Sequence, residues 1–88
     1  MIVRILGEGR YEVPDADLRS IEQLDVQLVG AMERGDEATF STTLAELIGE
    51  VRHTGTLVSP DDLRTSKLAV PHEGSTLAEV RALLTQES

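Results

Sequence analysis

The chain has 88 residues, no cysteine, and 16 acidic against 8 basic side chains, which give a formal net charge of -8. This length predicts one domain over residues 1–88 with a small core, and the lack of cysteine excludes a disulfide scaffold and is typical of a cytoplasmic setting. The acidic excess argues against binding to nucleic acid or anionic membrane surfaces, and no apolar run is long enough to predict direct membrane insertion.

Two short strand-like runs open the chain. Ile2–Leu6 is apolar around a single charge, and Arg10–Val13 alternates charged and apolar side chains. The link Gly7-Glu8-Gly9 between them suits a hairpin turn. Its glycine spacing matches neither the dinucleotide fingerprint nor the P-loop, so a phosphate-binding loop is not predicted.

A long amphipathic helix is predicted over Asp17–Arg34, with Asp15 or Asp17 as its N-cap. Its apolar residues recur at spacings of three and four and cover an arc of about 140°. They are Leu18, Ile21, Leu24, Leu28, Val29 and Met32. Asp25 falls inside this arc, where an unpaired carboxylate is costly to bury. We expect it at the rim of the core or paired with an arginine.

A second helix follows over Glu37–His53, after a tight turn in which Gly35 ends one helix and Asp36 caps the next. Such a short link predicts an antiparallel hairpin. One side of the second helix carries large apolar residues and is predicted as core: Phe40, Leu44, Leu47, Ile48 and Val51. An adjacent strip carries small residues: Ala38, Ser41, Thr42, Ala45 and Gly49. Thr43, Glu46 and Glu50 form the third side, predicted as polar.

The rest of the chain is predicted to form short secondary-structure elements. Gly55 ends the second helix, and Ser59-Pro60-Asp61-Asp62 begins a single helical turn through Arg64. Leu68–Val70 is predicted as a third strand. Thr76, with a glutamate three residues later, opens a last helix. Its predicted apolar face is Leu77, Val80, Leu83 and Leu84.

These elements predict an α+β fold. A small, mainly antiparallel sheet of three short strands, Ile2–Leu6, Arg10–Val13 and Leu68–Val70, is expected to pack against the antiparallel two-helix hairpin. The hairpin covers one face of the sheet, and a short C-terminal helix completes the domain.

Polar residues that could form a reactive site are sparse. His53, Asp61, Asp62, His72 and Glu73 do not have the spacing of a helical zinc motif. No histidine has an evident serine partner for nucleophilic catalysis. We therefore expect no catalytic residue, metal or cofactor. A small metal-dependent hydrolase that uses the acids around Asp61 and His72 is the weaker alternative.

Three stretches of the sequence together resemble the PspA-associated protein family, PspAA. They are MIVRILGEGRYEVPD, LRSIEQLDVQLVGAMERGDEATF and LVSPDDLRTSKLAVP...STLAEVRALL. The resemblance implies an accessory of the phage shock, or envelope-stress, response. It implies a partner in phage shock protein A, a coiled-coil, membrane-remodelling protein, or in a neighbouring component. Such a partner would recruit the chain to the inner face of the membrane.

A candidate partner-binding surface is the small strip of the second helix with its acidic border, because small residues let another helix approach closely. The residues are Ala38, Thr42, Ala45, Glu46, Gly49 and Glu50. The same strip also fits a plain solvent-exposed side. An adaptor for an unrelated helical partner is the other interpretation, and homo-oligomer formation is left open.

Overall fold

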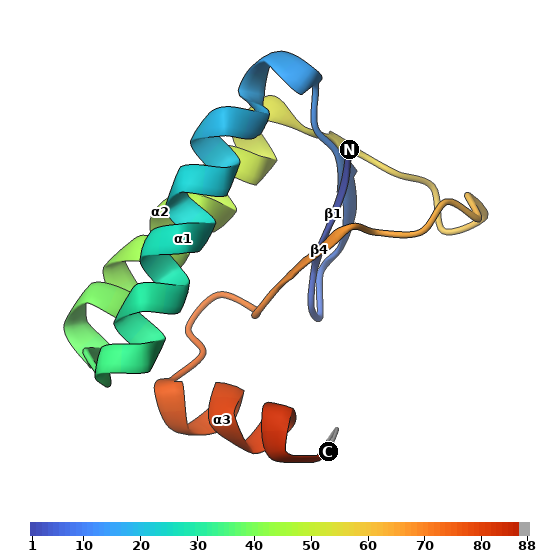
Figure 1. Ribbon diagram of the computed structural model, residues 1–88. Coiled ribbons are helices and arrows are strands. Elements are labelled where there is room, and N and C mark those ends of the chain that lie inside the picture. The colour runs from blue at the N-terminus through green and yellow to red at the C-terminus, as the bar shows by residue number, and fades with distance from the viewer. Residues whose placement is uncertain (87–88) are drawn as a thin grey trace.

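Four short strands form one mixed sheet in the order β3-β2-β1-β4 (Figure 1). The computed structural model describes the backbone of residues 1–86 and the side chains of residues 1–82. The strands are β1 Ile2–Ile5, β2 Gly9–Glu12, β3 Thr56–Leu57 and β4 Leu68–Val70. β1 pairs antiparallel with β2 and parallel with β4, and β2 pairs antiparallel with β3.

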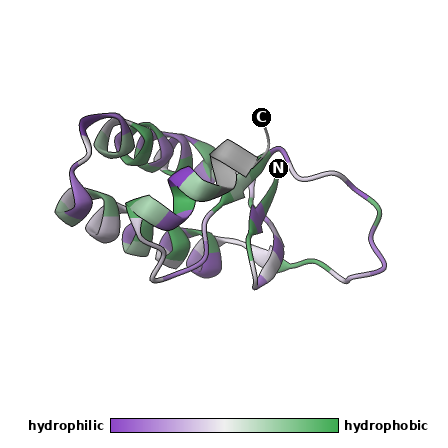
Figure 2. Cartoon of the chain, turned by 90° about the horizontal axis from the view of Figure 1, so that it is seen from below, coloured by the Kyte–Doolittle hydropathy of each residue, from purple (hydrophilic) through white to green (hydrophobic). Residues whose placement is uncertain are grey.

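The helices are the 3-10 turn η1 Asp15–Asp17, α1 Leu18–Arg34, α2 Glu37–Thr54 and α3 Leu77–Gln86. In Figure 1, α1 and α2 lie side by side on one face of the sheet, and α3 lies near the turn that joins them. The backbone of the segment between β3 and β4 projects beyond the edge of the sheet in Figures 1 and 2. The predicted α+β class and the helical hairpin are confirmed.

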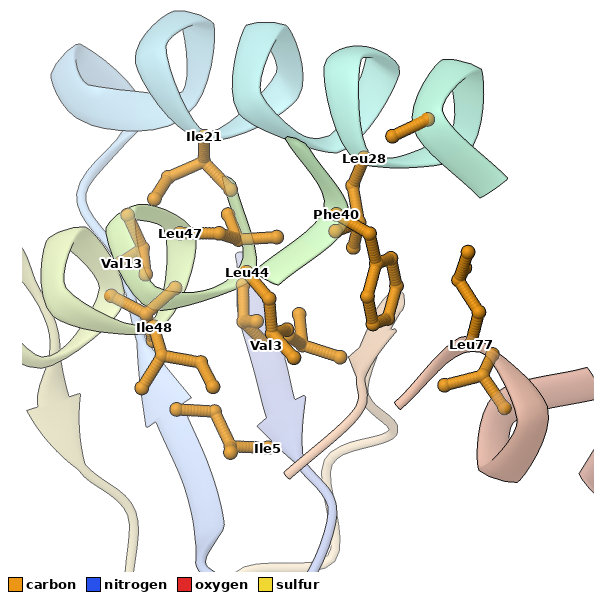
Figure 3. Close-up of a cluster of buried hydrophobic side chains, with 14 residues drawn as sticks. Val3, Ile5, Val13, Ile21, Leu28, Phe40, Leu44, Leu47, Ile48 and Leu77 are labelled. Carbon is orange, nitrogen blue, oxygen red and sulfur yellow. The ribbon is translucent and has the colours of Figure 1, made fainter. Parts of the chain in front are cut away.

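Buried apolar side chains from the sheet and the hairpin meet in one core (Figure 3). Strand alternation turns Val3 and Ile5 toward the helices, and both are almost fully buried. The predicted apolar stripe of α2 is buried throughout, and Leu77 and Val80 bring α3 into the same cluster. Leu83 and Leu84, predicted on the same face of α3, lie outside the residues whose side chains are described.

The predicted sheet was incomplete in two respects. Thr56–Leu57 forms a fourth strand, and two residues are too few to show the alternation by which strands are recognised. β4 runs parallel to β1 because the chain enters it beside the start of β1, where the Lys67 amide donates to the Ile2 carbonyl at 2.9 Å. The prediction of a mainly antiparallel, three-stranded sheet was therefore only partly correct.

The helical turn predicted at Ser59–Arg64 is absent, because this segment adopts a non-helical turn. Its carbonyl oxygens are bound from the sheet instead. The Arg10 guanidinium donates to the carbonyls of Arg64 and Asp62 at 2.6 Å and of Ser59 at 3.2 Å. Local capping signals predicted a helix here. The hydrogen bond from Arg10, which lies 52 residues before Asp62 in the sequence, favours another backbone conformation and outweighs those local signals.

Three side chains of the hairpin differ from the prediction. Val29 is 44% exposed, because it lies at the edge of the broad apolar arc of α1. Ala31 is fully buried and Thr43 is 4% exposed, although Thr43 was placed on the polar side of α2. Both are small enough to let two packed helices approach closely. Asp17, one of the two predicted N-caps of α1, does occupy the N-cap position, but its side chain makes no capping hydrogen bond.

Candidate protein-interaction surface

The turn between α1 and α2 fixes which side of each helix faces solvent. Gly35 adopts φ 70°, the left-handed conformation expected after a helix end. Asp36 then caps α2, accepting from the Thr39 amide at 3.1 Å and from the Thr39 hydroxyl at 2.6 Å. These bonds lower the pKa of Asp36 below its usual range. The helices therefore run antiparallel with a defined rotation.

This rotation leaves the small strip of α2 in solvent. The strip residues Ala38, Ser41, Thr42, Ala45 and Gly49 are all exposed. Of the two acidic border residues, Glu46 is exposed and Glu50 is half-buried. The six residues proposed from the sequence thus lie along one helix, on the side turned away from the core.

Gly49 lies within α2, five residues before its end, where glycine costs about 1 kcal/mol relative to alanine. A Cβ atom built at this position meets nothing within 4 Å. Gly55 differs, because a Cβ there would lie 2.6 Å from the Val51 carbonyl oxygen and 3.0 Å from the Tyr11 Cβ. Packing within the described chain therefore accounts for Gly55 but not for Gly49.

The outward side of α1 carries an apolar residue that the sequence argument left unassigned. Val26 is 70% exposed and lines a shallow surface hollow together with Arg19, Gln23 and Gln27. The sequence could have identified Val26 as an exposed apolar residue, because it falls outside the predicted core arc of the helix. Val26 and the strip lie on different helices of the same hairpin.

Asp25 is half-buried at the edge of the core, as the rim interpretation predicted. Partial burial raises the pKa of its carboxyl, because desolvation disfavours the charged form. Its side chain has no hydrogen-bond or ion-pair partner within the part of the chain that the structure describes. The arginine pairing considered for it is thus not formed there.

Three of the polar residues considered for metal binding or hydrolysis are engaged in separate contacts. Asp62 binds Arg64 at 2.8 Å, Glu73 binds Arg52 at 3.2 Å, and the His72 ring lies 3.5 Å from Glu79. Among the described residues, no group of three or more potential ligands is close enough to hold a metal ion. The fold does not gather the residues of the weaker, hydrolase hypothesis into one site.

A sequence profile of the PspAA family, described as PspA-associated protein, matches residues 1–88 and so covers the whole chain. The chain belongs to the PspAA family. The resemblance noted from three stretches of sequence is confirmed over its full length. No curated protein and no solved structure matches the chain significantly.

The PspAA family is named for an association with PspA, and that name describes an accessory protein. In the described part of the chain, none of the helices combines the length and the apolar content that crossing a membrane requires.

Proposed function

We propose that this PspAA protein is a non-enzymatic interaction module that binds phage shock protein A, or another component of the envelope-stress response. The family name supports the choice of partner. The candidate contact surface is the exposed strip of α2, with Glu46 and Glu50 at its border.

The observation that carries this proposal is Gly49. An exposed glycine within a helix weakens the helix, and no neighbouring atom explains it. A partner helix lying across the strip would explain the glycine. The axes of packed helices approach to about 8–10 Å, and the closest approach requires small side chains at the contact. A coiled-coil partner offers such a helix over a long surface.

Packing should matter more than charge in this contact. Ala45 and Thr42 are small enough for a helix to pass over them, whereas exposed ion pairs contribute typically under about 1 kcal/mol each. Glu46 and Glu50 are expected to steer a basic segment of the partner helix and to set its register.

The test is a titration of folded variants against the purified phage shock protein A coiled coil. Ala45→Arg is expected to weaken binding at least about tenfold, because a long charged side chain blocks close approach, while the fold stays intact. Ala78→Arg on α3 is the matched control, since it makes the same change at another exposed helical alanine. If both variants bind as the wild type does, the strip is only a solvent-exposed side.

A further inference from the structure

A second surface lies on the face of the sheet opposite the helices. Val3 and Ile5 point into the core (Figure 3). Strand alternation therefore turns the exposed Arg4 side chain outward. The β1–β2 register places Arg10 directly opposite Arg4 on the neighbouring strand. Two like charges in this arrangement destabilise a sheet, so the pair calls for an explanation.

The two guanidinium groups differ in what they bind. Arg10 is bound to three backbone carbonyls of the segment after β3. Hydrogen bonds from Arg64 lower the pKa of the nearby Asp62 carboxyl, and the charge of Arg10 adds to this effect, although Asp62 pairs directly with Arg64 rather than with Arg10. Arg4 is exposed, and its guanidinium has no hydrogen-bond or ion-pair partner among the described residues. Arg52 and Arg64, in contrast, are each paired with two carboxylates.

A surface hollow of about 350 Å³ lies beside these arginines. Leu57, Val58 and Pro60 supply its apolar lining. Val58 lies opposite Arg10, to whose carbonyl its amide donates at 2.8 Å, so it shares the outer face with Arg4 and Arg10, whereas Leu57 pairs with Tyr11 and lies on the face toward the helices. Glu8 is the carboxylate at the hollow, and it is already bound by the Arg52 guanidinium and by the Tyr11 hydroxyl at 2.6 Å. The hollow thus combines the Arg4 guanidinium, unpaired in the described part of the chain, with an apolar wall formed by Val58 and Pro60.

We infer that this hollow docks an acidic segment of a protein partner, with a carboxylate on Arg4 and an adjacent apolar side chain against Val58 and Pro60. Arginine binds carboxylates through two parallel hydrogen bonds, and a carboxylate at Arg4 also offsets the repulsion between Arg4 and Arg10. A concave site with an apolar wall fits one side chain and its neighbour better than it fits a flat membrane surface. The inference does not depend on binding to phage shock protein A.

The test uses the full chain, labelled with ¹⁵N, and a short peptide that carries one glutamate between two leucines. The matched peptide has glutamine in place of the glutamate. We expect the glutamate peptide to shift the amide signals of Arg4, Gly9 and Val58, and the glutamine peptide to leave them in place. Arg4→Gln should weaken binding at least about tenfold, which corresponds to the loss of one charge-assisted contact.

Two variants separate this site from general charge effects. Arg19→Gln removes the same charge from the exposed side of α1 and should leave the affinity unchanged. Arg4→Lys keeps the charge but loses the planar fork, so it should retain part of the affinity. Arg4→Gln should melt at or above the wild-type temperature, because it removes one of two opposed like charges.

Several outcomes overturn the inference. Equal shifts with both peptides, or equal losses in Arg4→Gln and Arg19→Gln, would show that no carboxylate site exists at Arg4. The same shifts with inorganic phosphate alone would reduce the hollow to a simple anion site. Arg4-dependent binding to vesicles of anionic phospholipid, without peptide binding, would assign the surface to a membrane.

Discussion

Gly49 has a low helix propensity, and it lies at a position of α2 where no contact in the described chain requires a glycine. Replacing this glycine by alanine adds one methyl group in open space. Gly49→Ala should therefore raise the free energy of unfolding by about 1 kcal/mol, as measured by chemical denaturation. The same methyl group should weaken binding to the phage shock protein A coiled coil, because it stands where the partner backbone is proposed to approach.

Gly30 offers a matched control for this prediction. It lies within α1, and a Cβ there would meet only the end of the flexible Arg34 side chain, at 3.2 Å. Gly30→Ala should stabilise the fold to a similar extent without changing the affinity for the coiled coil. Equal affinities of the wild type and Gly49→Ala would remove the main support for the strip as a contact surface.

Asp25 lowers the stability of the folded protein for a different reason, the partial burial of its carboxylate. Its folded-state pKa is raised by burial, so ionisation at neutral pH destabilises the folded state. Asp25→Asn should increase the free energy of unfolding at pH 7 by up to about 0.5 kcal/mol. The gain should vanish once the pH falls below the unfolded-state pKa of about 3.8, where the carboxyl is neutral in both states.

Denaturation curves of Asp25→Asn and of Glu22→Gln, compared at several pH values, check this. Glu22 is an exposed carboxylate on the same helix. A pH dependence shared by both variants would trace the effect to net charge rather than to the burial of Asp25.

At the scale of elements, the β1–β2 turn is tied to α2 by an ion pair. The Arg52 guanidinium binds Glu8 of the turn, its Nε lying 3.0 Å from Glu8 Oε2, and binds Glu73 before α3. Hydrogen bonds from the Arg52 guanidinium and from the Tyr11 hydroxyl lower the pKa of Glu8 from 4.5 to about 2. Three segments that are distant in the sequence thus meet at one guanidinium.

The lowered pKa of Glu8 gives a signed pH prediction. Stability from this carboxylate is fully present above pH 4.5 and is lost as the pH falls through about 2. Glu8→Gln should lose less stability over that window than the wild type does, by less than about 1 kcal/mol because the pair is partly exposed. Thermal melts at stepped pH measure it, with Glu33→Gln as the charge control. Identical acid profiles for wild type and Glu8→Gln would contradict the assignment.

Elements defined by local patterns were predictable, and those defined by distant contacts were not. The periodicity of Leu28 or Leu47 fixes a helix and its buried side within a few residues, so the hairpin was found from the sequence. The direction of β4 and the path of Ser59–Arg64 depend on Lys67 meeting Ile2 and on Arg10 reaching across the sheet. No short-range pattern encodes such contacts.

In the candidate sites, too, features set by local patterns were predictable and features set by distant contacts were not. The exposure of Ala45 and Gly49 follows from the helical period, and the sequence indicated it. The pairing of Arg4 with Arg10 depends on the register of the two strands. A sequence-based hairpin prediction does not give the register, because its strand bounds are not accurate to one residue. The position of Val58 beside Arg10 requires β3, the strand that the sequence did not reveal.

For the whole molecule, the two proposed surfaces lie on opposite sides of the sheet. The acidic border of α2 belongs to the helical layer, and Arg4 belongs to the outer face of the sheet. At physiological salt the Debye length is about 8 Å, and the molecule measures 34 × 27 × 19 Å. We therefore expect little electrostatic coupling between the surfaces, despite the net charge of -8.

A double-mutant cycle tests this independence. Ala45→Arg should reduce affinity for the coiled coil by the same factor in the wild-type and Arg4→Gln backgrounds, within about 0.5 kcal/mol. The measurement is a set of four titrations under one buffer condition. A larger interaction energy would mean that one partner contacts both surfaces, or that the sheet transmits the change.

The parallel pairing of β1 with β4 also affects how the nascent chain folds on the ribosome. β1 is synthesised first and can pair with β2 as soon as residue 12 has emerged, but its other edge has no partner until residues 68–70 appear. An apolar strand with an open edge is a template for pairing with other chains. Throughout the synthesis of the helical hairpin, aggregation at this edge therefore competes with folding, and a chain stopped before Leu68 should precipitate more readily than the full-length protein.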